Sequence, residues 1–247
     1  MLRGLYISAS GMIADEIRHQ VISNNLANAN TTGYKKDLVI GQTFPEVLIN
    51  CLYKNQTKAI GPINLGAGVC DIPVKMTPGM IETTGNNLDL ALEGDGFFVL
   101  ETLSGRRFSR QGNFCLDKQG YLSNMNGELL LGENGFIKVD PNGETLKVLA
   151  DGSIFQGSVF VDKLLLVNYA PSALVKEGNS KFRVTAPEET LASKPDVIQG
   201  ALERSNVNII EEMVAMINLM RTYESEQKVI QAHNETLGKL INEMANL

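Results

Sequence analysis

A heptad pattern near the end of the chain is the feature that most constrains the fold. Between residues 207 and 246, apolar or amide side chains recur in alternating steps of four and three, at Ile209, Met213, Met216, Met220, Tyr223, Gln227, Ile230, Asn234, Leu237, Ile241 and Met244. On a helix this spacing forms one narrow stripe, as in a coiled coil. The helix would be about 60 Å long. We therefore predict a long C-terminal helix that needs a partner to cover its stripe.

The polar residues of this segment fit the same interpretation. Asn206 or Asn208 is suited to cap the start of the helix, and two glutamates follow at positions 211 and 212, near its positive end. Gln227 and Asn234 interrupt the apolar stripe. Buried amides at such positions reduce stability but fix the register between helices.

The beginning of the chain predicts a second helix. Over about residues 1–30, apolar side chains recur every three or four positions, at Leu2, Tyr6, Ala9, Ile13, Ile17 and Val21. An Asn- and Thr-rich stretch over 23–33 then competes for backbone hydrogen bonds. We expect the helix to end there, with Gly33 as its C-terminal cap.

The middle of the chain has a different pattern. Short apolar runs over 97–100, 136–139, 146–149 and 159–167 alternate with Gly, Asn and Asp turns, which is typical of antiparallel hairpins. Residues 36–75 show no sustained period and contain several Gly and Pro residues, so we expect at most one short strand there. The predicted fold is α+β, with an N-terminal helix in 1–35, an extended connector in 36–75, a central all-β domain in 76–200 and a C-terminal helix in 201–247.

Composition and charge exclude several classes of function. The net charge is −6 and the pI is near 5.1, which disfavours binding to nucleic acid or to an anionic membrane. No apolar run approaches the length of about 20 residues that spans a bilayer, and the N-terminus lacks the pattern of a cleaved signal peptide. Cys51, Cys70 and Cys115 have no CxxC spacing and are interpreted as inert thiols, so we expect no metal and no cofactor.

Catalytic patterns are weak. His19 and His233 both fall on the predicted terminal helices, and neither accompanies a nucleophile motif. The carboxylates Asp89, Glu93 and Asp95 are close in sequence and leave open a hydrolase, for instance one that cuts cell-wall glycan. Acidic residues at hairpin ends are far commoner than such sites, so we do not expect an enzyme.

Three groups of residues form short motifs along the chain. The first follows the N-terminal helix, the second opens a predicted strand and the third precedes the C-terminal helix. Their members are Asn24, Asn25, Leu26, Ala27, Asn28 and Gly33; Gly94, Gly96, Phe97 and Phe98; and Ser205, Asn206 and Val207. These motifs resemble those of a known family, the flagellar rod and hook proteins, and they occur in the same order over nearly the whole chain.

This resemblance implies a structural subunit of the flagellar basal-body rod. Such a protein would leave the cell uncleaved through the flagellar type III export apparatus and cross the periplasm as part of the rod. Its terminal helices would pair and stack with further copies and with other rod proteins in a helical shaft that transmits torque to the hook. The short chain favours a proximal rod subunit, with a distal subunit as the alternative. A β-domain binding module with a discrete coiled coil is the alternative from another class.

Overall fold

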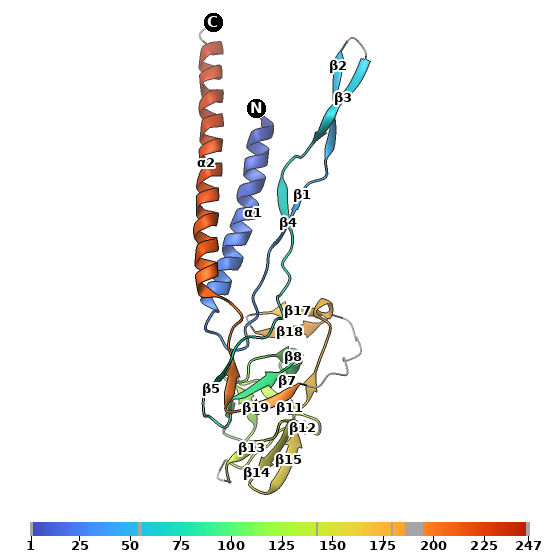
Figure 1. Cartoon of the computed structure of the whole chain (residues 1–247), viewed down its shortest axis with the longest axis vertical. Helices are drawn as coiled ribbons and strands as arrows, with labels where there is room; N and C mark the ends of the chain where they lie inside the picture. The colour runs from blue at the N-terminus through green and yellow to red at the C-terminus, as the bar shows by residue number, and fades with distance from the viewer. Residues whose placement is uncertain (1, 54–55, 142, 179, 186–194, 246–247) are drawn as a thin grey trace. The chain divides into compact units, whose positions relative to one another are not determined.

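The computed structural model describes residues 2–53, 56–141, 143–178, 180–185 and 195–245 and shows an α+β protein (Figure 1). The chain folds as two compact units. The helical unit contains the two long helices together with residues 37–73, and the β unit contains residues 28–36 and 74–207. The α+β class predicted from the sequence is confirmed.

The two helices lie side by side and run antiparallel in the helical unit. They are α1, Leu2–Ala27, and α2, Ile209–Ala245. Asn208 caps α2, because its Oδ1 accepts a hydrogen bond from the Ile210 N–H at 3.1 Å. Both helices were predicted, as was Asn208 as one of two possible caps. Gly33, however, is not the cap of α1, because that helix ends six residues earlier, at Ala27.

Neither helix is long and apolar enough to cross a membrane, over the residues that the structure describes.

Residues 37–73 contain more strand than the sequence indicated. Strand β1, Ile40–Thr43, pairs with β4, Ala67–Asp71, and β2, Val47–Tyr53, pairs with β3, Gln56–Ile63. Both pairs are antiparallel, and β4 packs on α1 within the helical unit. The expectation of at most one short strand was therefore wrong.

The β unit is built from antiparallel pairs. Its largest sheet has the order β17-β18-β8-β7-β11-β10-β9, with β12 paired to β11 and β16 paired to β7. These strands are β7 Phe97–Thr102, β8 Gly105–Ser109, β9 Phe114–Leu116, β10 Leu122–Asn124, β11 Leu129–Gly132, β12 Gly135–Phe136, β16 Leu166–Val167, β17 Leu174–Glu177 and β18 Lys181–Val184. A short 3-10 helix, Pro171–Ala173, precedes β17.

Three smaller sheets complete this unit. The first has the order β13-β14-β15, and the other two pair β19 with β6 and β20 with β5. Their bounds are β5 Ile81–Thr83, β6 Leu90–Glu93, β13 Leu146–Val148, β14 Ser153–Gln156, β15 Val159–Lys163, β19 Asp196–Gln199 and β20 Ala201–Glu203. The predicted run over 159–167 is thus two strands rather than one, because β15 ends at Lys163, Leu164 forms only an isolated bridge with Gly132, and β16 begins at Leu166.

The largest sheet separates two apolar cores. Phe98 and Leu100 on β7 enter one core with Leu122, Leu130 and Ile154, while Phe97 and Val99 on the same strand enter the other with Phe108 and Phe182. This alternation follows from the two-residue period of a strand. It explains why the run over 97–100 is apolar throughout: both of its faces are buried.

Candidate assembly surface

The register of the helix pair advances by heptads on both helices. The side chain of Asn25 on α1 reaches Glu212 on α2, with 3.4 Å between Nδ2 and Oε2. Seven and fourteen residues further along α2 lie Leu219 and Glu226, and a Cβ added to Gly11 would lie 2.3 Å from Glu226 Oε1. One heptad beyond, a Cβ on Gly4 would lie 2.8 Å from His233 Nε2. The two glycines therefore let the helices approach closely.

This register buries a line on α2 that differs in part from the predicted stripe. Glu212 and Leu219 are buried, and the half-buried residues of the line are Met216, Glu226, Ile230, His233 and Leu237. Met216, Ile230 and Leu237 belong to the predicted stripe, whereas Glu212, Leu219, Glu226 and His233 do not. Gln227 and Asn234, expected to fix a helix register, are exposed.

The rest of the predicted stripe is uncovered. Met213, Ile217 and Met220 have relative exposures of 51%, 52% and 49%, and Ile209 and Ile210 beside them are also exposed. At about 100° per residue these five residues fall on one side of α2, beside the line that contacts α1. We call them the outer apolar face. A contiguous apolar patch on a helix is a feature of interaction surfaces.

Three further stripe residues of α2 are exposed for different reasons. Tyr223 lies at the edge of the line that contacts α1 and is 38% exposed. Ile241 and Met244 are exposed because α2 continues past the start of α1 (Figure 1). The helix α1, as described, begins at Leu2, within one turn of the Gly4–His233 contact.

On α1, the predicted stripe is also only partly covered. Tyr6 and Ile13 are exposed, while Ile17 and Val21 are half-buried. The side chain of Leu2 lies outside the described part of the structure. The structure thus brings the two terminal helices together and leaves apolar side chains of both uncovered.

Acidic groups lie between the two helices. Asp15 on α1 is only 3% exposed; its Oδ1 lies 3.0 Å from the Arg18 Nη1, and its Oδ2 has no hydrogen-bond partner. Glu226 on α2 likewise has a buried Oε2 without a partner. Burial raises the pKa of Glu226 above its usual range, and the Asp15 carboxylate raises it further.

The raised pKa of Glu226 predicts a pH-dependent effect of Glu226→Gln. Folding raises the pKa of this carboxyl group from its unfolded value of 4.5, so the group stabilises the fold at pH values below 4.5. That contribution is lost as the pH rises through the raised pKa of the folded state. We therefore expect Glu226→Gln to stabilise the helix pair by about 1 kcal/mol at pH 7 and to change nothing near pH 4. Urea titrations followed by helical circular dichroism measure this, with exposed Glu224→Gln as control. Equal effects at both pH values would contradict it.

Three charged side chains meet in the interior of the β unit, around Glu203, beside the motif residues Gly33 and Gly94. The Glu203 Oε1 accepts hydrogen bonds from Lys35 Nζ at 2.5 Å and from the Gly79 N–H at 2.8 Å. Its Oε2 lies 3.3 Å from Arg110 Nη1, and all three charged side chains are at most 3% exposed. Burial lowers the pKa of Lys35, and the Glu203 carboxylate opposes that shift.

The glycines and phenylalanines of these motifs shape the same region. Gly33 has φ +66°, and its N–H donates to the Glu203 carbonyl at 2.8 Å. The Gly94 carbonyl accepts from Arg110 Nη2 at 2.7 Å. A Cβ on Gly96 would lie 2.6 Å from Pro195 Cγ, so no side chain fits there. Phe97 and Phe98 occupy the two apolar cores, as described above.

The asparagines of the motifs join backbone segments. Asn206 Oδ1 accepts from the Lys36 N–H at 2.7 Å, and its Nδ2 donates to the carbonyls of Lys75 and Thr77 at 2.8 and 3.0 Å. In the helical unit, Asn25 Oδ1 accepts from the Asp37 N–H at 3.0 Å and its Nδ2 donates to the Asp37 carbonyl at 2.9 Å. The segment after α1 and the segment before α2 are thus both fixed by amide side chains.

The remaining motif residues are divided between the interior and the surface. Asn28 and Val207 are buried in the β unit, and Ser205 accepts a hydrogen bond from the Val207 N–H at 3.3 Å. Leu26 is half-buried, whereas Asn24 and Ala27 are exposed. The sequence patterns did not identify Lys35, Arg110 and Glu203 as a cluster.

The carboxylates considered for hydrolysis do not form an evident site. Both oxygens of Asp89 accept hydrogen bonds, from Thr84 Oγ1 at 2.6 Å and from Asn86 Nδ2 at 3.2 Å, and so close a turn. Glu93 and Asp95 are exposed. Among the described residues no group of His, Cys, Asp and Glu side chains could hold a metal ion. Cys70 and Cys115 are free thiols, and the side chain of Cys51 lies outside the description.

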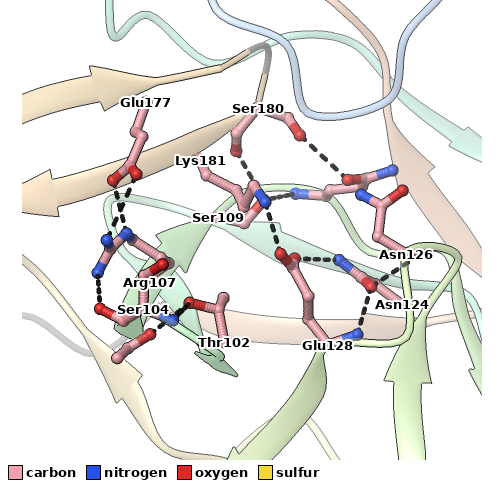
Figure 2. Close-up of polar contacts among 12 residues, drawn as sticks. Thr102, Ser104, Arg107, Ser109, Asn124, Asn126, Glu128, Glu177, Ser180 and Lys181 are labelled. Carbon is pink, nitrogen blue, oxygen red and sulfur yellow. Dashed lines mark hydrogen bonds and ion pairs between the residues drawn. The ribbon is translucent and has the colours of Figure 1, made fainter.

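A polar groove on the β unit is internally paired. Figure 2 shows Arg107 beside Glu177, with 2.6 Å between Nε and Oε2, and Lys181 beside Glu128, with 2.5 Å between Nζ and Oε1. The hydrogen bonds from Arg107 hold the pKa of Glu177 below its usual range. Because these charges already have partners, the groove offers less to a charged ligand than the uncovered helix surface does.

Comparison with known proteins places this architecture in a class. Three family models match: "Flagella basal body rod protein" over residues 5–35, "Flagellar hook protein FlgE/F/G D1 domain" over 91–156, and "Flagellar basal body rod FlgEFG protein C-terminal" over 198–244. These ranges include most of α1, much of the β unit and most of α2. The class is that of the rod and hook proteins of the bacterial flagellum.

Whole-chain relatives narrow this class. The flagellar basal-body rod protein FlgG of Bacillus subtilis is 32% identical, over 98% of this chain and 99% of the relative. The flagellar basal-body rod protein FlgF of Mesorhizobium japonicum is 31% identical, over 91% of this chain and 90% of the relative. The flagellar hook-basal body complex protein FlhO of B. subtilis is 28% identical over the full length of both. The chain belongs to the flagellar basal-body rod protein family.

Proposed function

We propose that this protein polymerises through α1 and α2, with further copies of itself and with other rod proteins, into the helical shaft of the flagellar rod. The outer apolar face of α2 is the observation that supports this most. Three of its side chains are about half exposed beside the line that contacts α1. A neighbouring helix that covered them would bury apolar surface at about 25 cal/mol per Å².

The geometry of the surface suits an open assembly. The outer apolar face and the uncovered residues of α1 are different surfaces, so contact between them on successive copies need not close into a dimer. Head-to-tail contacts that do not close generate a helical filament. Methionines on the outer apolar face can adapt to slightly different neighbours along such an array.

The position of the protein in the rod and its export route are parts of the same proposal. The protein would be exported by the flagellar type III apparatus and would act in the periplasm-spanning rod, where a rigid shaft transmits torque to the hook. We favour a proximal position because of the short chain, and a distal position is the alternative, since relatives with both names match at similar identity. If growth is head-to-tail, loss of a proximal subunit also removes every rod segment beyond it.

The outer apolar face can be tested by charge. We expect Met213→Asp/Ile217→Asp/Met220→Asp to abolish swimming of a deletion strain that the wild-type chain restores, because each buried carboxylate would cost several kcal/mol in the assembled contact. The matched control is Asn87→Asp/Gln119→Asp/Ser158→Asp, which adds the same charge to exposed residues of the β unit. Swimming-zone diameter and counts of isolated rods are the measurements. Wild-type swimming by the first variant would contradict the proposal.

A further inference from the structure

An acidic pocket opens between α1 and α2. Its volume is about 270 Å³, and it is lined by Asp15, Glu16, His19, Leu219, Met220 and Tyr223. The α1 side is polar, whereas the α2 side is largely apolar. A long side chain with an apolar stem and a cationic end fits such a lining.

The negative charge of this pocket is not neutralised within the described chain. Asp15 is more than nine-tenths buried and keeps one carboxylate oxygen, Oδ2, without a partner. Glu16 is exposed and has no ion pair among the described residues. Glu226 lies nearby with a buried unpartnered oxygen. Arg18 is the one cation paired with this group in the described structure, and its guanidinium contacts only the other oxygen of Asp15.

A complementary basic stripe runs along the opposite side of α2. Arg221, Lys228 and Lys239 are exposed, and none has an ion pair in the part of the chain that the structure describes. At about 100° per residue they fall within about 20° of one line, far from the line of Leu219 and Glu226 that contacts α1. One chain therefore carries both halves of a charge-complementary contact, on surfaces that cannot meet within the same helix pair.

We propose that Arg221 of a second copy enters this pocket. Its guanidinium faces Glu16 and Asp15, and its stem lies on Leu219, Met220 and Tyr223. Arginine suits the site because its planar group can engage two carboxylate oxygens at once and it always carries charge. Because pocket and stripe are different surfaces, each added copy leaves a free pocket or a free stripe, which permits continued growth.

This inference rests on the proposed function and adds the chemistry of the contact. Met220 belongs both to the pocket lining and to the outer apolar face, so the two surfaces are continuous. The apolar face would supply most of the contact area. The ion pair between Arg221 of one copy and the carboxylates of the next would fix the register of the two copies. Charge complementarity sets specificity and register more than it sets affinity.

A charge exchange tests the pairing directly. In the deletion strain, we expect Glu16→Lys and Arg221→Glu each to lower the number of complete rods per cell by about tenfold, the equivalent of one close charge pair. The double variant Glu16→Lys/Arg221→Glu restores the opposite charges and should recover at least about half of the wild-type count. Cells that express both single variants together should recover as well, because each supplies the surface that the other lacks.

Controls separate pairing from folding and from net charge. Asn87→Lys and Asn87→Glu change the charge at an exposed residue of the β unit and should leave rod counts unchanged. Circular dichroism of the purified variants checks that the helices are intact. Wild-type counts in both single variants, or a double variant as defective as the worse single one, would overturn the pairing while leaving the proposed function in place. If the wild-type chain itself failed to restore rods, the proposed function would fall, and the pairing with it.

Discussion

Glu203→Ala is expected to lower the free energy of unfolding of the β unit by about 3–5 kcal/mol. The substitution removes the single carboxylate that lies between Lys35 and Arg110, both of which are buried. Two cations would then share a low-dielectric interior without the carboxylate that contacts both of them, and the Gly79 N–H would lose its acceptor. Urea denaturation followed by tyrosine fluorescence measures the loss, since the chain has no Trp.

The control for this variant is an ion pair of the same chemistry on the surface. Glu82 lies 3.1 Å from Arg204, and both side chains are more than half exposed. Exposed pairs contribute at most about 1 kcal/mol, so Glu82→Ala should change stability little. If Glu203→Ala proved as mild as Glu82→Ala, the buried cluster would not be a structural centre of the β unit.

Gly33→Ala should destabilise the β unit by about 3 kcal/mol, the second large effect. Gly33 adopts φ +66°, which costs about 1–2 kcal/mol for a residue with a Cβ. An added Cβ would also lie 2.4 Å from the backbone carbon of Arg110, and overpacking of this kind costs about 1–3 kcal/mol more. The change acts on the segment that also carries Tyr34 and Lys35, both buried.

Gly127→Ala separates the two causes. Gly127 also has a positive φ, +79°, but nothing lies within 4 Å of an added Cβ. Its substitution should therefore show the backbone cost alone, about 1–2 kcal/mol in the same urea titration. If both substitutions lowered the free energy of unfolding equally, the backbone of Arg110 would move away from the added Cβ at no energetic cost.

The helices and the turn-rich centre could be predicted because their signals are local. Heptad spacing sets the length of α2, and Asn208 caps it through a contact two residues away. The side of α2 that meets α1 was harder to predict. The spacing of apolar residues indicates which side of a helix is buried, but it does not distinguish burial within one chain from burial between chains. Here the contact with α1 also uses Glu212, Glu226 and His233, which apolar periodicity does not reveal.

The strands in residues 37–73 were missed for another reason. Strand β1 pairs with β4, about 30 residues away, and no local sequence pattern in Ile40–Thr43 indicates that pairing. Pro and Gly residues inside this segment also suggested a connector; Gly61 and Pro62 lie within β3 itself. Pairing between distant segments decided the structure there.

The buried ion cluster was missed because each charge is ordinary in its own segment. Lys35 lies 75 residues before Arg110, and Arg110 lies 93 residues before Glu203. Charged residues are mostly exposed in proteins, so none of the three is expected to be buried from its own segment. Only the fold brings them within hydrogen-bond distance.

Electron microscopy of basal bodies from a deletion strain tests the central claim most directly. The strain would carry either the full-length chain or a chain that lacks residues 207–247, and swimming would be scored alongside. We expect complete rods and swimming only with the full-length chain, because α2 carries the outer apolar face. Normal rods in the deletion strain without any complementation, or with the shortened chain, would contradict a role for this protein as a rod subunit that assembles through α2.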